Sequence, residues 1–289
     1  MKLAIHFRNF TMPGEPASLS GLLAATAAAA DDGGVDTMTV MDHWFQMEQT
    51  APATDPMLEA YTTLGFLAAN TSRLKLGTLV TGVTYRYPGL LAKIVATLDV
   101  LSEGRAFLGL GAAWYEKEHL ALGVPYPPIA TRFEMLEEAI QICEQMWSDD
   151  EGPYEGKYYQ LAETICRPRP IQSPRPPILL GGTGEKKTLR LVARYADAWN
   201  CFDLGVEGIG AKLAILDEHC AAVGRDPAEI ERTAISTGNP IGDTDAFLFR
   251  MDQYAKLGIT KVWVAVPPPD PAGFVRQLTE TVLPRLADI

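Results

Sequence analysis

The sequence predicts a (β/α)8 barrel, and three observations lead to this prediction. Short apolar runs alternate with longer amphipathic patterns along the whole chain, and no consecutive hairpins interrupt them. Barrels of this kind commonly fill about 250 residues as one domain, and the chain has 289. The alternative, a doubly wound open sheet, is expected to carry G-x-G-x-x-G after its first strand, whereas the chain has RNFTMPGEPASLSG there.

The short apolar runs are expected to form the barrel strands. Each run is rich in β-branched or aromatic residues and is apolar on both alternating faces, which is typical of a parallel strand buried on two sides. The eight runs lie at residues 3–7, 37–42, 76–82, 107–111, 177–182, 197–202, 233–238 and 261–266.

Between the runs, apolar residues recur every three or four positions, the spacing of a helix that packs one stripe against a sheet. Asp55-Pro56, Asp226-Pro227 and Asp270-Pro271 are expected to start helices. The clearest stripes are Leu90, Leu91, Ile94, Leu98 and Leu101 within Tyr87–Leu101, and Phe133, Leu136, Ile140, Cys143 and Trp147 within Thr131–Trp147.

Residues 149–177 break this alternation, because they are rich in Pro, Gly and Tyr and show no helical period. The segment is too long for a plain connection, so we expect an insertion that passes over the barrel, with a short hairpin near Tyr158–Leu161. The chain is therefore expected to be a single TIM-barrel domain over residues 1–289, with an insertion at about 149–177.

The overall charge favours a small-molecule substrate. The chain has 25 Lys and Arg against 36 Asp and Glu, a net charge of −11, and this surface repels nucleic acids and anionic membranes. Its four cysteines form no C-x-x-C pair, and its first residues, MKLAIHFRNF, lack a signal-peptide pattern. We therefore expect a cytoplasmic protein with reduced thiols and no membrane or nucleic-acid partner.

The active sites of such barrels lie at the C-terminal ends of the strands, and the second strand ends in Met41-Asp42-His43-Trp44. A histidine there can bind a ring or move a proton, because its pKa lies near neutrality. The alternative is a partly buried structural histidine. His6 lies within the first strand, where it can point into the barrel, whereas His219 is expected to be structural. His119 follows Glu116 at a spacing of three, but no second copy of this pattern occurs, so no metal site is expected there.

Two more strand ends attract attention. The fifth strand runs into Gly181-Gly182-Thr183-Gly184, followed by Lys186 and Lys187 and a helical pattern. Glycines let a backbone approach a ligand, and free amides at a helix start bind anions, although such turns also occur for geometry alone. The fourth strand ends in GLGAAWY (109–115), whose small residues leave room for a flat group or pack closely at the rim.

These motifs, in this order, resemble the luciferase-like monooxygenase superfamily, and within it the branch of oxidoreductases that use coenzyme F420, a 5-deazaflavin. The most specific segment is LGTLVTGVTYRYPGLLAKIVATLDVLSEGRAFLGLGAAWYEKEHLALGVPYPP (76–128). MDHWF (41–45), PYEGKYYQLAETICRPRP (153–170) and ILLGGTGEKKTLRLVARYADAWN (178–200) agree in order and spacing.

The resemblance implies a barrel fold, a homodimer and coenzyme F420, with FMN as the alternative cofactor. It implies that Asp42 and His43 lie beside the flavin-type ring, and that a non-prolyl cis peptide at Leu79-Val80 backs that ring. Further residues are implied to line the cofactor, namely Thr81, Gly111, Ala112 and Ala113, or to hold its phosphate, namely Gly181, Gly182, Thr183 and Gly184.

The function expected from this resemblance is hydride transfer between the deazaflavin C5 and a small apolar or planar substrate. His43 would give or take the proton, Asp42 would position His43 or the ring, and the substrate side would be shaped by Trp44, Trp114 and Tyr115. Trp114 stands where the glucose-6-phosphate dehydrogenases of the family carry a catalytic Glu. This departure argues against a sugar phosphate.

Two alternatives stay open, and a third is disfavoured. The first is an FMN-dependent monooxygenase that receives reduced flavin from a partner reductase. The second is a flavin- or deazaflavin-binding protein without turnover. The third, a cofactor-free lyase, would need a Schiff-base lysine at a strand end, whereas Lys75 and Lys261 stand at strand starts.

Overall fold

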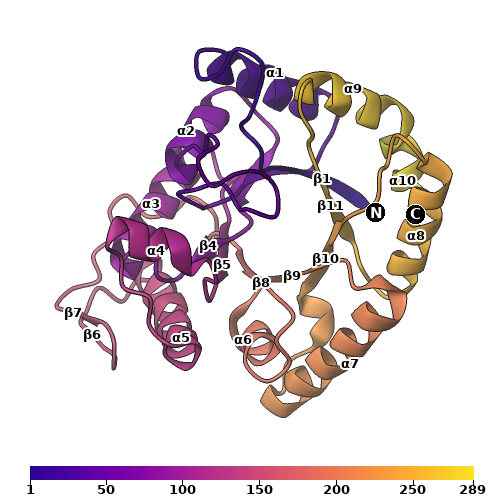
Figure 1. Cartoon of the computed structure of the whole chain (residues 1–289). Helices are drawn as coiled ribbons and strands as arrows, with labels where there is room; N and C mark the ends of the chain where they lie inside the picture. The colour runs from indigo at the N-terminus through magenta and orange to yellow at the C-terminus, as the bar shows by residue number, and fades with distance from the viewer.

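The computed structural model describes residues 1–289 as a ring of parallel strands surrounded by helices (Figure 1). The sheet order is β3-β2-β1-β11-β10-β9-β8-β5-β4. Its strands are β1 (Lys2–Phe7), β2 (Thr37–Val40), β3 (Lys75–Thr78), β4 (Thr81–Gly82), β5 (Leu108–Gly111), β8 (Ile178–Gly181), β9 (Ala198–Cys201), β10 (Glu231–Ser236) and β11 (Lys261–Ala265).

Each of the eight apolar runs is a barrel strand, so the predicted (β/α)8 barrel is confirmed. The run 76–82 is divided into β3 and β4 because the chain bulges at Leu79 and Val80. The ring closes between β3 and the start of β5, where Leu76 pairs with Ala106 and the Phe107 amide donates to the Leu76 carbonyl at 3.0 Å.

Two apolar layers hold the barrel together, because alternate residues of each strand point to opposite sides of the sheet. A cluster of 64 buried residues fills the space between the strands and the helices. A smaller cluster fills the inside of the barrel, and its members are Ala4, Phe107, Leu179, Ala198 and Trp263.

The helices cover the outside of the ring (Figure 1). None of them combines the length and apolar composition needed to cross a membrane. They are α1 (Leu19–Asp32), α2 (Ala60–Ala69), α3 (Pro88–Leu101), α4 (Glu116–Leu122), α5 (Ile129–Met146), α6 (Thr188–Tyr195), α7 (Gly205–Val223), the 3-10 helix η1 (Pro227–Glu229), α8 (Thr244–Lys256), α9 (Pro271–Thr281) and α10 (Leu283–Ala287).

The predicted helix starts are partly confirmed. Asp270 caps α9 by accepting a hydrogen bond from the Gly273 amide. Asp226 caps only the short helix η1. The prediction at Asp55 is wrong, because α2 begins at Ala60 and Glu59 accepts the amides of its first turn.

The predicted stripe of α3 also needs correction. Leu91, Val95 and Leu98 are buried, whereas Leu90 and Leu101 are 63% and 68% exposed. Two overlapping sets of residues on α3 satisfy the same three-and-four spacing. The set that packs against the barrel lies on the side of the helix that also carries its small alanines.

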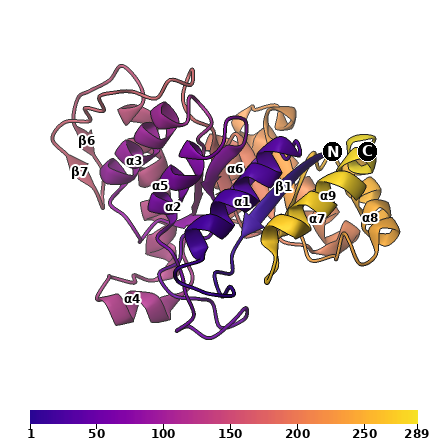
Figure 2. The ribbon, with the colours of Figure 1, turned by 90° about the horizontal axis from the view of Figure 1, so that it is seen from above.

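The segment 149–177 lies on the outer side of α3 and α5. Its short hairpin pairs β6 (Tyr154–Glu155) with β7 (Gln160–Leu161), and Glu138 of α5 accepts amides from the turn between them. Figure 2 shows this hairpin and α4 at opposite ends of the molecule. Because α4 follows the C-terminal end of β5, the segment does not pass over the barrel mouth as expected.

Candidate active site

The end of the barrel at which the strands finish is the candidate active site, and we call it the mouth. The loops after β2, β4, β5 and β8 carry the polar residues that the sequence analysis selected. In Figure 2 helix α4 lies at this end.

His43 and Glu118 form a buried pair in the mouth. The Nδ1 atom of His43 lies 2.8 Å from Oε1 of Glu118, whose side chain is fully buried on α4. Tyr85 donates its hydroxyl to the same oxygen. The other oxygen, Oε2, accepts the amides of Trp44 and Phe45 at 2.9 and 3.2 Å. Glu118 therefore fixes both the histidine ring and the backbone that follows it.

This pair also sets the tautomer of the histidine ring. Burial opposes ionisation of Glu118, but hydrogen bonds from His43 and other donors outweigh it and hold the pKa of that carboxyl below its usual range. An ionised carboxylate only accepts hydrogen bonds, so Nδ1 of His43 carries a proton. In the neutral ring, Nε2 then holds the lone pair and is free to accept a proton.

Asp42 is bound by Arg86 rather than by His43. Arg86 donates to Asp42 and to Glu59, so its guanidinium joins a buried carboxylate to a half-exposed one. Burial raises the pKa of Asp42 although Arg86 lies beside it. The Thr81 hydroxyl, 2.9 Å from the Tyr61 hydroxyl, is also fully buried. Asp42 and Thr81 thus belong to one buried polar network.

Aromatic rings surround His43. Trp114 meets it edge-on with ring centroids 5.5 Å apart, and Tyr115 stacks on Trp114 at 5.1 Å. Trp44 packs against Tyr85 instead, with centroids 4.4 Å apart. Trp114 is 49% exposed, whereas Tyr115 is buried. Of the three aromatic residues predicted on the substrate side, Trp114 is the one most open to solvent.

The floor of the mouth is a bulge at Leu79 and Val80. The peptide bond between them is cis, as the resemblance implied. Both side chains pack on the cluster inside the barrel and stay partly exposed. They therefore present an apolar surface to whatever enters the mouth.

Glycines on the neighbouring strands make room for this bulge. A Cβ atom at Gly111 or Gly181 would lie 3.0 or 3.1 Å from Val80, and one at Gly109 would lie 2.0 Å from the Thr78 carbonyl oxygen. The glycines of the fourth predicted strand thus serve close packing at the rim, one of the two alternatives left open above.

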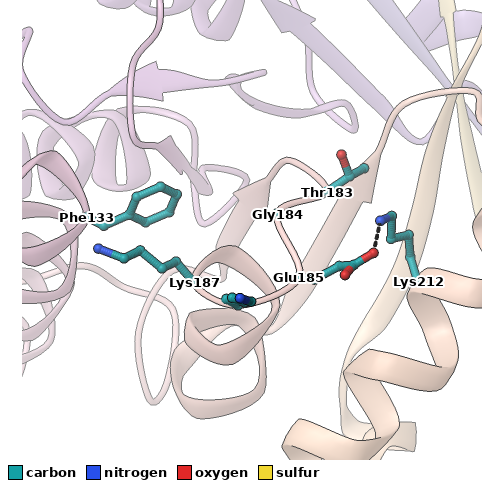
Figure 3. Close-up of a pocket in the computed structure, with 7 residues that line it drawn as sticks. Phe133, Thr183, Gly184, Glu185, Lys187 and Lys212 are labelled. Carbon is teal, nitrogen blue, oxygen red and sulfur yellow. Dashed lines mark hydrogen bonds and ion pairs between the residues drawn. The ribbon is translucent and has the colours of Figure 1, made fainter. Parts of the chain in front are cut away.

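The glycine turn after β8 borders a pocket of about 430 Å³. Gly182 has φ of +119°, and a Cβ atom at Gly184 would lie 2.8 Å from the Thr188 hydroxyl oxygen. Lys212 pairs with Glu185, and Lys187 extends toward Phe133 of α5 (Figure 3). The pocket is lined by Phe133, Thr183, Gly184, Glu185, Lys186, Lys187 and Lys212.

The other histidines have structural partners. His6 lies inside the barrel at 2.9 Å from the Thr39 hydroxyl, and burial lowers its pKa to about 3. His119 bonds to the Thr84 hydroxyl and the Tyr115 carbonyl. His219 lies 2.8 Å from the carbonyl oxygen of Glu185 and so braces the glycine turn.

Sequence reasoning missed Glu118 and the pairing of Arg86. Glu118 is 75 residues from His43, so no local spacing connects them. A usable signal was present, because a carboxylate in a helix directly after a strand end lies at the mouth. Arg86 follows the third strand in the same way.

The barrel mouth combines a buried histidine–glutamate pair with an apolar floor and a glycine turn flanked by lysines. This combination is typical of an enzyme that acts on a small molecule. The chain belongs to the luciferase-like monooxygenase family, whose model matches residues 1–247.

The chain is also similar to individual proteins, in sequence or in fold. The chain is similar to an F420-dependent glucose-6-phosphate dehydrogenase of Kineococcus radiotolerans, with 35% identity over 222 residues. That match covers 74% of this chain but 62% of the relative, less than two thirds of its length. The fold is similar to that of a coenzyme F420-dependent tetrahydromethanopterin reductase from Methanopyrus kandleri, with a TM-score of 0.78, 19% identity and coverage of 99% of this chain and 100% of the other.

Proposed function

We propose that this protein is an F420-dependent oxidoreductase that transfers a hydride between the deazaflavin C5 and a small, uncharged, apolar or planar substrate. The observation that carries the proposal is the position of the His43–Glu118 pair. It lies at the same end of the barrel as the Leu79–Val80 floor and the cationic glycine turn. The F420-dependent relatives of the chain support the choice of cofactor.

The residues of the mouth fit a phosphorylated tricyclic ring. Leu79 and Val80 provide a flat apolar contact, and no side chain on Gly111 or Gly181 obstructs it. Lys186 and Lys187 supply positive charge beside the exposed glycine turn, which suits a phosphate. When bound, the deazaflavin supplies hydride chemistry at C5.

His43 is the proposed proton donor or acceptor. Glu118 holds Nδ1, so Nε2 is the atom that gives or takes the substrate proton. Trp114 and Tyr115 cover His43 from the side and limit the access of water.

The pairing of Arg86 and the exposed ring of Trp114 favour an uncharged substrate on the His43 side. Arg86 is the cation nearest to Asp42, and both Asp42 and Glu59 already occupy its guanidinium. The guanidinium of Arg86 is therefore not free to bind a sugar phosphate. Trp114 offers instead a half-exposed aromatic face, which suits an apolar or planar group.

Paired equilibrium titrations of the purified protein with F420 and FMN, followed by fluorescence, test the proposal. We expect tight, saturable F420 binding and weak FMN binding, followed by hydride exchange with a panel of uncharged carbonyl and enone acceptors. Preference for FMN together with oxygen consumption would show a flavin monooxygenase. Binding of neither cofactor would contradict the proposal.

A further inference from the structure

Arg132 on α5 is a buried cation without a hydrogen-bond partner. The residue is only 6% exposed, and neither its Nε nor its Nη1 atom has a hydrogen-bond acceptor. Only one other buried side-chain nitrogen or oxygen in the chain lacks a partner, Nε1 of Trp263. No carboxylate lies within ion-pair distance of Arg132, although most of the arginines have one.

Such a group is costly in a folded protein. A buried guanidinium needs acceptors for its N–H groups, and leaving it unpaired costs several kcal/mol of solvation. The Tyr126 ring, 3.9 Å from the guanidinium carbon, provides a cation–π contact. A ring face is a weak hydrogen-bond acceptor, so the enclosed donors Nε and Nη1 stay unsatisfied.

The guanidinium lies at the start of α5. Side chains in a helix tilt toward its N-terminus, and Arg132 reaches back to Tyr126, which precedes α5. No side chain caps the first turn of α5, so its free amides add positive potential at the same place. Tyr126 donates its hydroxyl to the carbonyl of Trp114, which places this group beside the mouth.

The same turn of α5 borders the glycine pocket. Phe133, the next residue after Arg132, lines that pocket, and its ring faces the Lys187 ammonium (Figure 3). Glu137 further along α5 binds Arg190 and Arg194 of α6, which fixes the two helices side by side. A phosphate bound at the glycine turn therefore has the start of α5 as its neighbour.

We propose that Arg132 and the first turn of α5 form an anion subsite that binds a carboxylate in the acidic tail of the cofactor. The inference rests on the proposed function. Beyond its phosphate F420 carries the free carboxylates of its glutamates, because its lactyl carboxyl forms the amide to the first glutamate, whereas FMN ends at the phosphate. A planar guanidinium matches a carboxylate with two parallel hydrogen bonds. The subsite would thus distinguish the two cofactors by their tails rather than by their rings.

The test compares the wild-type protein with Arg132→Met, which keeps an apolar stem over Tyr126. Each is titrated by fluorescence with three ligands, namely F420, the analogue that lacks only the glutamates, and the deazaflavin riboside that lacks phosphate and tail. We expect Arg132→Met to weaken F420 binding about 10- to 100-fold and to leave riboside binding unchanged. The lactyl carboxyl is free only in the glutamate-free analogue. A loss seen with F420 but not with this analogue assigns the contact to a glutamate carboxylate, and a loss seen with both assigns it to the lactyl position next to the phosphate. An equal loss for all three ligands, or for none, would overturn the proposal.

A second measurement needs no cofactor. Because the charge is unpaired in the ligand-free protein, Arg132→Met should raise the Tm by a few degrees, about 2–4 °C for each kcal/mol. A lower Tm would show that Arg132 has a structural role and would overturn the subsite. If wild-type protein bound neither F420 nor the riboside, the proposed function would fail, and the Tm would still decide whether Arg132 is an unpaired charge.

Discussion

The two sides of the barrel mouth treat charge differently. Beside β2 the charged groups are paired within the protein, since Glu118 binds His43 and Arg86 binds Asp42. Beside β8 the cations Lys186 and Lys187 have no carboxylate partner, and neither has Arg132 at the start of α5.

This difference separates two tasks. A paired and buried group keeps its orientation and protonation before any ligand arrives, which is what proton transfer requires. An unpaired cation gains its partner only when an anion binds, and so contributes affinity. We therefore expect substitutions on the β2 side to change the rate of the reaction, and those on the β8 side to change the binding of the cofactor.

The largest expected effect is that of His43→Ala. Loss of a general acid or base lowers kcat by about 10²- to 10⁴-fold, and the cofactor affinity should stay the same because the anion-binding side is untouched. Steady-state kinetics and a fluorescence titration of F420 check both parts. An unchanged kcat, or a loss seen only as weaker F420 binding, would break the proposed division of tasks.

Glu118→Gln should lower kcat about 10- to 100-fold and alter its pH profile, since the amide can donate to Nδ1 of His43 and favour the wrong tautomer. It should also lower the free energy of unfolding by about 1–3 kcal/mol. The folded-state pKa of Glu118 is depressed, so this stabilisation is present above the ordinary carboxyl pKa of about 4.3 and is lost as the pH falls further.

Glu116→Gln is the matched control, because Glu116 is exposed on the same helix and makes no hydrogen bond through its side chain. Denaturant unfolding between pH 3 and 7 follows both variants. If Glu116→Gln and Glu118→Gln behaved alike, Glu118 would not be the residue that holds His43.

The third prediction concerns the stability of the folded protein in acid, which depends on His6 inside the barrel. His6 is neutral in the folded protein down to a pKa of about 3, whereas in the unfolded chain it binds a proton below about 6.5. The unfolded state therefore gains stability as the pH falls through this window, and at pH 5 His6 costs about 2 kcal/mol. His6→Asn should reduce the loss of stability between pH 7 and pH 5, measured by chemical denaturation, whereas His219→Asn should keep it.

The smallest expected effect is that of Lys186→Gln combined with Lys187→Gln. Loss of two exposed charges beside a phosphate should weaken F420 binding about tenfold at low salt and less at high salt. The value of kcat at saturation should not change. Lys256→Gln, on the distant helix α8, serves as the control. A change in kcat without a change in affinity would contradict the role of the β8 side.

The strands could be predicted from the sequence because burial on two sides leaves an unmistakable apolar run. The stripe of α3 could not, because Leu90 and Leu91 both satisfy the helical spacing and only packing decides between them. The reason for the rim glycines was also hidden. Gly109 reads as space for a ligand until the structure shows the Thr78 backbone in that space.

The sequence predicts where the candidate site lies, but it does not predict which side chains bind one another there. The strand-end rule selects His43, Trp114 and the glycine turn, since it depends only on the order of elements. The partners of His43 and Asp42 lie 75 and 44 residues away. Nothing in the sequence indicates that Arg132 is buried, because an arginine in an amphipathic helix is normally expected on the solvent-exposed face.

The hairpin of the segment 149–177 offers a practical handle on the protein. It lies at the end of the molecule opposite α4 (Figure 2), and all four native cysteines are buried. A thiol introduced at exposed Glu163, as Glu163→Cys, would therefore be the accessible one. A dye or surface linker attached there would leave the mouth facing solution, so that cofactor binding can be followed on an immobilised, singly labelled molecule.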